Sequence, residues 1–276
     1  MSRPADLPDF DNPPVVETVL SVQFESVNGI HAAHLGLLWD EFRPMFPSSD
    51  ERPPLEQVIE QFPETSRVRV GLQLQTFESL PVPRLCFVNR QGNEMIQVQP
   101  DRFIKNWRKE GEGERYPHYD ETIKPMFERD FATFIAFLKK YQFEPPIINQ
   151  CEVTYVNHIL SGEGWETFAD FEEIFNFWNG PRVDIPGRVE DLRAHARFTI
   201  PDHRGEPIGR LHADVQPAFR TSDNRPMYVF HLTARGQVGR GFEFFDIGRR
   251  WIVKSFASLT TPKMHEIWRR KDVPRG

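Results

Sequence analysis

The amino-acid sequence predicts an α+β protein made of two β-α-β-β-β-α units, with a mainly antiparallel curved sheet and helices on one face. A strand opening, Pro13-Pro14-Val15-Val16, recurs 132 residues later as Pro145-Pro146-Ile147-Ile148. After each opening come an amphipathic helix, several strands and a longer aromatic helix, which indicates an internal duplication. Apolar and polar residues alternate in most strands, as is typical of a sheet with one covered and one open face.

The duplication gives a simple division of the chain. The first unit covers residues 13–144 and the second covers residues 145–268. A flexible tail is expected at residues 1–12 and a basic tail at residues 269–276. By analogy of topology, the arrangement resembles duplicated folds built like the TATA-binding protein, in which a curved sheet carries its helices on the convex side. Such an analogy concerns the fold and does not give a function.

Composition excludes several classes of protein. Hydrophobic residues make up 39% of the 276 residues and charged residues 27%, which is typical of a globular chain. No apolar run approaches the ~20 residues that span a bilayer, and the first residues lack a signal peptide, so we expect a cytoplasmic protein. The net charge of −6 argues against a nucleic-acid coat over the whole surface, but not against a local basic surface. Cys86 and Cys151 lie in strand-like runs and fit reduced, buried thiols.

The first unit opens with a strand at residues 17–24, where the period is two. Apolar residues from Leu35 to Phe46 have helical spacing, and a short helix is expected at 55–62. Three strands are then expected, at residues 68–74, 84–89 and 95–99. A charged, aromatic loop at 100–118 would lead to a long helix, for which Asp120 is the expected N-cap.

The second unit repeats this plan. A strand at residues 149–156 precedes an amphipathic helix at 168–178, which Asn179-Gly180-Pro181 would end. Three strands are then expected, at residues 192–199, 210–215 and 228–235. The first two would be joined by a hairpin turn at 202–205, and the closing helix covers 245–259.

The polar positions of these strands predict an open face rich in Arg, Gln and His. In the first unit these positions are Arg67, Arg69, Gln73, Gln75, Gln97 and Gln99. In the second they are Arg193, His195, Arg197, Arg210, His212, Asp214, His231, Thr233 and Arg235. Such side chains carry directional donors that suit phosphate, carboxylate or base edges. We therefore expect an anionic ligand, nucleic acid included. A solvated face or a polar homodimer interface would explain the same residues.

A second candidate is the segment from Gln97 to Tyr119, where basic and aromatic residues are interleaved. Asn106 and Trp107 stand at its centre, among Lys105, Arg108, Lys109 and Arg115. Cations beside aromatic rings suit single-stranded nucleic acid or a nucleotide. The alternative is a loop anchored in the core by its aromatic residues. We expect Phe103 to serve as such an anchor, while Trp107 fits either role.

Catalytic hypotheses rest on one cluster. His212 and Asp214 share a strand face, with His195 and His231 on strands expected nearby, so acid–base chemistry or a metal site is conceivable. Chance placement in a histidine-containing sheet is the favoured explanation of the cluster. The motifs of phosphate loops, serine hydrolases and zinc proteases are missing from the sequence, and no cofactor is implied. His31 and His34 are expected to be surface or capping residues.

Several short segments form a distinctive set: Pro13 to Glu17, Ile96 to Gln99, Arg102-Phe103, Asn106-Trp107, Tyr116 to Tyr119 and Glu152 to Asn157. Together they resemble a sporadically distributed family of bacterial proteins of about this length to which no activity is assigned. The resemblance covers nearly the whole chain and implies a bacterial cytoplasmic protein. A patchy distribution is typical of mobile genes, including defence and toxin–antitoxin loci. It implies no catalytic residue.

Together these patterns predict a binding protein without catalysis. Its open sheet face and its aromatic–basic segment would take an anionic ligand, a nucleic acid or a protein partner. The alternative is a hydrolase-like or metal-dependent enzyme that uses the histidine–aspartate cluster. A third possibility is a protein–protein module, such as an antitoxin or accessory subunit, with residues 97–119 as its contact.

Overall fold

The computed structural model describes residues 7–62, 82–111, 113–180, 187, 189–237 and 242–271. The strands are β1 (Val15–Phe24), β2 (Ser48–Arg52), β3 (Arg84–Val88), β4 (Glu94–Gln99), β5 (Arg102–Arg108), β6 (Ile148–Leu160), β7 (Ala194–Pro201), β8 (Pro207–Phe219) and β9 (Pro226–Gly236). The helices are α1 (Ala32–Phe42), α2 (Lys124–Lys140), α3 (Phe171–Ile174), α4 (Glu243–Leu259) and α5 (Pro262–Ile267). A π-helical turn, η1 (Tyr119–Ile123), leads into α2.

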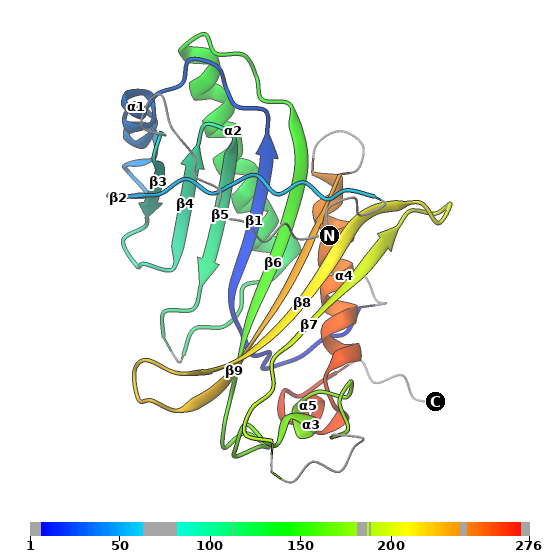
Figure 1. Ribbon diagram of the computed structural model, residues 1–276. Helices are drawn as coiled ribbons and strands as arrows, with labels where there is room; N and C mark the ends of the chain where they lie inside the picture. Colours follow the sequence, from blue (N-terminus) through cyan, green and yellow to red (C-terminus); the bar gives the residue numbers. More distant parts are fainter. Residues whose placement is uncertain are drawn as a thin grey trace.

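The nine strands of the described residues form one curved antiparallel sheet, in the order β2-β3-β4-β5-β1-β6-β9-β8-β7. The strands β1 and β6, which open the two predicted units, pair with each other near its centre. The long helices α2 and α4 lie behind the sheet in Figure 1, and the other face is turned to the viewer. The α+β class and the antiparallel sheet with one helix-covered face are as the sequence predicts.

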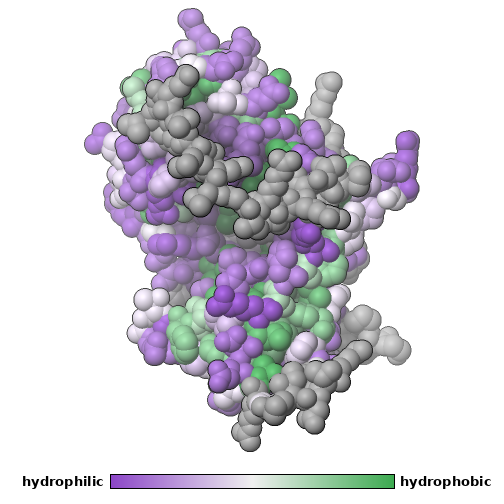
Figure 2. Space-filling view, viewed as in Figure 1, coloured by the Kyte–Doolittle hydropathy of each residue, from purple (hydrophilic) through white to green (hydrophobic). Residues whose placement is uncertain are grey.

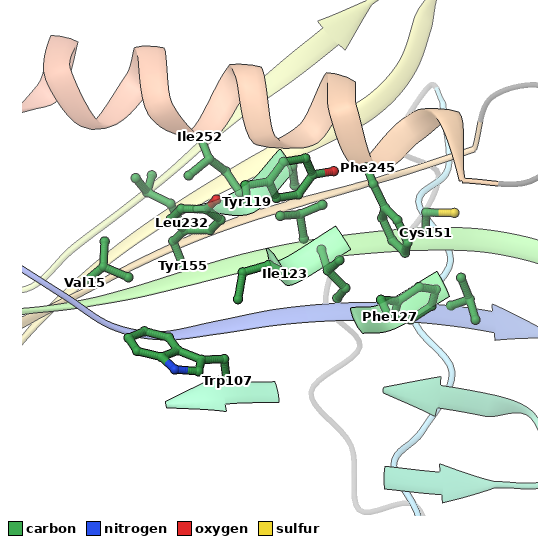
Figure 3. Packing of buried hydrophobic residues seen from close by; sticks show 14 of the residues in the cluster. Val15, Trp107, Tyr119, Ile123, Phe127, Cys151, Tyr155, Leu232, Phe245 and Ile252 are labelled. Atoms are coloured by element: carbon green, nitrogen blue, oxygen red, sulfur yellow. The ribbon is translucent and has the colours of Figure 1, made fainter. Parts of the chain in front are cut away.

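Aromatic side chains fill the layer between the sheet and its helices. Phe103 of β5 packs edge-on against Phe127 and Phe131 of α2, with ring centroids 5.7 and 5.4 Å apart. Phe127 in turn meets Phe245 of α4 at 4.9 Å, and Figure 3 shows these two rings within the layer. Burying one phenylalanine stabilises a fold by roughly 1.5–3 kcal/mol. The predicted role of Phe103 as a core anchor is confirmed.

A pair of glycines sets how closely α4 approaches the sheet. Gly209 of β8 and Gly236 of β9 are register partners. The Phe244 ring at the start of α4 lies directly on this pair, where a Cβ atom on Gly209 would come within 2.6 Å of it. Only residues without a side chain leave room for the ring, so α4 is held against the second half of the sheet.

A buried ion pair ties β5 to α2. Lys105 is 3% exposed, and its Nζ lies 2.7 Å from Oδ2 of Asp130, which is fully buried. The contact has the distance of an ion pair but not the direction of a good hydrogen bond. Glu94 of β4 accepts a hydrogen bond from the same Nζ at 2.8 Å. The charge of Lys105 is thus neutralised on the covered side of the sheet.

Most predicted elements are confirmed, with extended limits for several strands. β6, β8 and β9 run for 13, 13 and 11 residues and exceed the predicted lengths. Cys86 and Cys151 are buried free thiols, as expected. His34 Nδ1 accepts a hydrogen bond from the backbone of His31, which confirms a capping role. The strand predicted at residues 68–74 lies outside the described residues.

Three predicted elements are wrong. Residues 100–118 were expected to be a loop, but β5 occupies Arg102–Arg108, because Lys105 is neutralised and its neighbours alternate between the two faces. The helix expected at 168–178 is reduced to α3, since Phe175 turns into an extended conformation and forms a β-bridge with Thr260.

The third wrong element is the short helix expected at 55–62, which is an extended segment without helical hydrogen bonding. The predicted N-cap of the long helix is wrong as well. Asp120 does not cap α2; it lies in η1, and its carboxylate is 3.3 Å from the Arg249 guanidinium of α4. None of the helices in the described residues is both long enough and apolar enough to cross a membrane.

Candidate functional site

An extended segment of the chain lies across the open face of the sheet. We call residues 53–62 the strap; it follows β2 and runs in front of the central strands, crossing them at a steep angle (Figure 1). It begins with Pro53-Pro54, and proline fixes φ, removes a backbone donor and disfavours helix in the residue before it. Figure 2 shows the same face, where hydrophilic residues predominate around the middle of the coloured surface. The strap covers part of the face that the sequence predicts to bind a ligand.

Glutamine side chains of the sheet bind the backbone of the strap. Gln99 of β4 donates to the carbonyl of Leu55 and accepts from its N–H, both at 2.9 Å. Gln23 of β1 does the same with Val58, at 3.1 and 2.9 Å. A primary amide has one carbonyl and one NH₂ group, so it pairs with a peptide unit much as a neighbouring strand would.

Further contacts extend this pattern along the strap. Gln150 of β6 accepts from the N–H of Glu60 at 2.9 Å and donates to the carbonyl of Val58. Arg102 of β5 donates to the carbonyl of Glu56 at 2.7 Å. Each of these contacts is with backbone, so it holds an extended chain regardless of its side chains.

The side chains that hold the strap form one row across the sheet. Gln99 is the register partner of Arg102, Arg102 of Gln23, and Gln23 of Gln150. We call these four residues the amide row, after the three glutamines among them. They are all buried, with between 1% and 6% of each residue exposed, although their strand positions face away from the helices. The strap is what covers them.

At the end of the strap, Glu60 is surrounded by two guanidinium groups and an imidazole. Its carboxylate accepts a hydrogen bond from His212 Nε2 at 2.6 Å and is bonded by Arg210. Arg235 approaches to 3.9 Å and also pairs with Glu152. The Glu60 side chain is only 6% exposed. We call Arg210, His212 and Arg235 the cationic cluster, after its two guanidinium groups.

The electrostatics of Glu60 are those of a bound anion. Burial alone would raise the pKa of this carboxyl. The His212 hydrogen bond and the positive charges of the cluster lower the pKa by more than burial raises it, so the net pKa lies below its ordinary value. Arg210 adds a contact with the ring of Phe62, 4.7 Å from its centroid, and donates to the carbonyl of Gln61 at 3.3 Å. A carboxylate held this way is ionised at neutral pH.

The other predicted residues of the second unit lie beside the cluster on more exposed positions. His195 Nδ1 of β7 is 3.2 Å from the Asp214 carboxylate, while its ring lies 6.0 Å from that of His212. His231 is exposed on β9 in register with Asp214. Arg197 is exposed on β7, and Arg193 is exposed just before that strand.

The acid–base hypothesis concerns this group of histidines and Asp214. One histidine and one aspartate touch, His195 and Asp214, but more than half of the His195 side chain is exposed, so solvent and salt screen their interaction. His212, which the hypothesis also needs, binds Glu60 instead. Within the described part of the chain, no group of three or more His, Cys, Asp or Glu residues is placed to hold a metal ion.

In the first unit, the predicted residues that the structure describes are buried, with Gln97 and Asn106 on the same face of the sheet as Gln99 and Trp107 on the helix-covered face. Gln97 donates to Asn106 at 2.7 Å, and Asn106 donates to Glu17 at 2.6 Å. Both amides are about 95% buried, at 6% and 5% exposed. Trp107 is 4% exposed and its indole N–H donates to Glu114 at 3.3 Å, so its ring takes the core role. Arg67 and Arg69 lie outside the described residues.

Sequence analysis missed Glu60, Gln23, Arg102 and Gln150. Gln23 occupies a polar position of an alternating strand, which is the same signal that identified Gln99. Nothing in the sequence links these residues to the strap, because residues 23, 60, 102 and 150 meet only in the folded chain. Comparisons of the chain with protein-family models, with curated proteins and with solved structures gave no match.

Proposed function

We propose that this chain is a non-catalytic binding protein whose open sheet face takes an extended polypeptide segment with an acidic side chain from a protein partner. In the free chain the strap fills this place. One observation carries the proposal: the amide row binds backbone while the cationic cluster binds a carboxylate, Glu60. Backbone contacts supply affinity and a charge pocket supplies selectivity, which is the division found in peptide-binding proteins.

The charges on this face favour a peptide over a nucleic acid. The cationic cluster converges on one carboxylate rather than following a line of phosphates. Glu152 already pairs with Arg235, and Glu17 accepts from Asn106 nearby on the same face. A nucleic acid would have to displace these acids or lie beside them, and such binding depends mainly on uncompensated cations.

The architecture supports an internal duplication as part of the proposal. Outward from the β1–β6 pair, the strand order runs β5, β4, β3 on one side and β9, β8, β7 on the other. In each half, the first strand therefore pairs with the last one, and the strands before the last follow outward in reverse order. The topology of the TATA-binding protein is analogous. The cationic cluster belongs only to the second half, so the proposed site arises where the halves differ.

A peptide added in solution has to compete with the tethered strap. A short tether gives the strap an effective concentration of about millimolar, so the wild-type chain would hide the site from a moderate ligand. The variant Glu60→Gln keeps the shape of the side chain and removes its charge. A hydrogen bond to a charged group contributes about 1.5–3 kcal/mol, so this variant should free the face for a competing segment.

We expect a labelled synthetic peptide of residues 52–62 to bind the full-length Glu60→Gln variant at least about tenfold more tightly than the wild-type chain. Fluorescence anisotropy measures both affinities. The same peptide carrying Glu60→Gln should bind the variant about tenfold more weakly, because the cationic cluster then has no carboxylate to bind. A peptide carrying Glu56→Gln is the matched control and should keep its affinity, since only the backbone carbonyl of Glu56 contacts Arg102.

The outcomes separate the proposal from its alternatives. Equal affinity of the Glu60→Gln peptide and the unmodified peptide would contradict recognition of the acidic side chain. Displacement of the peptide by single-stranded DNA at physiological salt, with a steep salt dependence, would favour the nucleic-acid hypothesis instead.

A further inference from the structure

A second candidate site lies on the other side of the sheet, between the strands and α4. It is a cavity of about 200 Å³, bordered by the N-terminal segment, the start of β1, β6, β9 and the loop that precedes η1. Val15, Leu232, Ile252 and Phe256 provide apolar walls. Figure 3 shows Val15, Tyr155, Leu232 and Ile252 together at one end of the buried layer beside α4. An apolar cavity of about 150 Å³ is large enough to hold benzene, so this one suits one or two fused rings.

Asn157 supplies a buried hydrogen-bond acceptor in the wall of this cavity. Its side chain is 1% exposed, and its Nδ2 donates to the carbonyl of Phe230 at 3.0 Å, which fixes the orientation of the amide. Its Oδ1 has no hydrogen-bond partner among the described residues. A buried carbonyl oxygen without a donor is unfavourable, so the site calls for an N–H or O–H group.

A pair of tyrosines supplies a donor. The hydroxyl oxygens of Tyr116 and Tyr155, both in the cavity wall, lie 2.7 Å apart. The pair has two hydroxyl protons and uses one for the bond between them, so the other can donate to a carbonyl oxygen. Burial raises the pKa of both tyrosines, which therefore stay protonated at physiological pH.

The rim of the cavity favours an uncharged occupant. Lys271 lies 2.5 Å from Asp11 and 3.9 Å from Asp9, so these charges compensate one another. Arg115 and His118 are exposed at the rim, where water and salt screen the charge of the guanidinium group. The acceptor, Asn157 Oδ1, and the donor, a hydroxyl of the Tyr116–Tyr155 pair, lie away from this rim, among the apolar side chains of the cavity wall.

We propose that this cavity binds a small neutral ring compound of the amide or lactam type. Its N–H donates to Asn157 Oδ1, its carbonyl oxygen accepts from the Tyr116–Tyr155 pair, and its ring packs against Val15 and Leu232. The proposal rests on the cavity and does not depend on the strap or on the peptide site.

The test uses two isosteric probes, 2-quinolinone and coumarin. They differ in one ring position, where the lactam has an N–H and the lactone has an oxygen. Calorimetric titration of the full-length chain should show saturable binding of 2-quinolinone and at least about tenfold weaker binding of coumarin, because the oxygen leaves Asn157 unpaired. Failure of 2-quinolinone to saturate, or equal affinity of the two probes, would overturn the proposal.

Two variants locate the binding. Val253→Phe enlarges a half-buried residue of the cavity wall and should abolish binding of 2-quinolinone without lowering the melting temperature. Asn157→Leu should remove the preference for the lactam, since the acceptor is gone. Unchanged affinity in the Val253→Phe variant would place the ligand elsewhere and contradict the proposal, even if Asn157→Leu fails to fold. Glu60→Gln should leave 2-quinolinone binding unaltered, which separates this site from the proposed peptide site.

Discussion

Replacing Gly236 with alanine is expected to lower the free energy of unfolding by about 3 kcal/mol. The added Cβ would meet the carbonyl oxygen of Ile208 and would lie 2.6 Å from Cζ of Phe244. The first obstacle is backbone of the neighbouring strand and the second is a buried ring, so neither can move aside without a shift of α4 or of the sheet. Urea unfolding, followed by circular dichroism, measures the loss.

A second glycine gives the control for this prediction. Gly36 lies in α1, and a Cβ there would meet no atom within 4 Å. Gly36→Ala should therefore stabilise the chain by about 1 kcal/mol, through the higher helix propensity of alanine. Similar effects of the two substitutions would show that α4 does not depend on the glycine pair.

Replacing Asp130 with asparagine is expected to cost about 3–5 kcal/mol, because it leaves the Lys105 charge buried with an incomplete set of partners. Lys105 is 3% exposed and lies between Glu94 and Asp130, and its Nζ is 4.5 Å from the ring centroid of Phe46. The Glu94 side chain is 25% exposed, so solvent partly screens its charge, and it compensates Lys105 less fully than the buried Asp130 does. The free energy of unfolding of the variant, from urea titration at neutral pH, tests this.

Two further variants sharpen that test. Glu128→Gln changes an exposed carboxylate of the same helix and should alter stability by no more than about 0.5 kcal/mol. Removing both charges, with Lys105→Met and Asp130→Leu together, should restore much of the loss, since an apolar pair of similar size needs no compensation. A double variant as unstable as Asp130→Asn alone would contradict an electrostatic cause.

Apolar and polar residues alternate strictly in a strand that has one covered face, and this period of two predicted the sheet. It failed at β5, where Lys105 occupies a core-side position that a charged residue rarely takes. The spacing of Leu55, Val58 and Phe62 suits a helix as well as a strap, so the local pattern could not decide. The hydrogen bonds that hold the strap come from strands far away in sequence, and these are what select the extended form.

The sequence predicted the residues that the sheet contributes to the candidate site, but not the carboxylate that they bind. Alternation places Arg210, His212 and Arg235 on the open face, and their chemistry indicates an anionic ligand. The carboxylate that fills this place in the structure belongs to Glu60, 150 residues away from Arg210 in sequence. Its own neighbourhood, Val58 to Phe62, has no feature that indicates a contact with β8. The cavity beside Asn157 was equally hidden, since it forms from elements that meet only on folding.

Hydrogen exchange of the strap amides tests the central claim most directly, namely that the cationic cluster holds an acidic extended segment on the open face. The N–H groups of Leu55, Val58 and Glu60 donate to side chains of the sheet. In the wild-type chain they should be protected. In the Glu60→Gln variant their exchange should accelerate at least about tenfold, while amides of β1 and β6 keep their rates. Equal protection of the strap amides in both proteins, or its absence from the wild-type chain, would contradict the account.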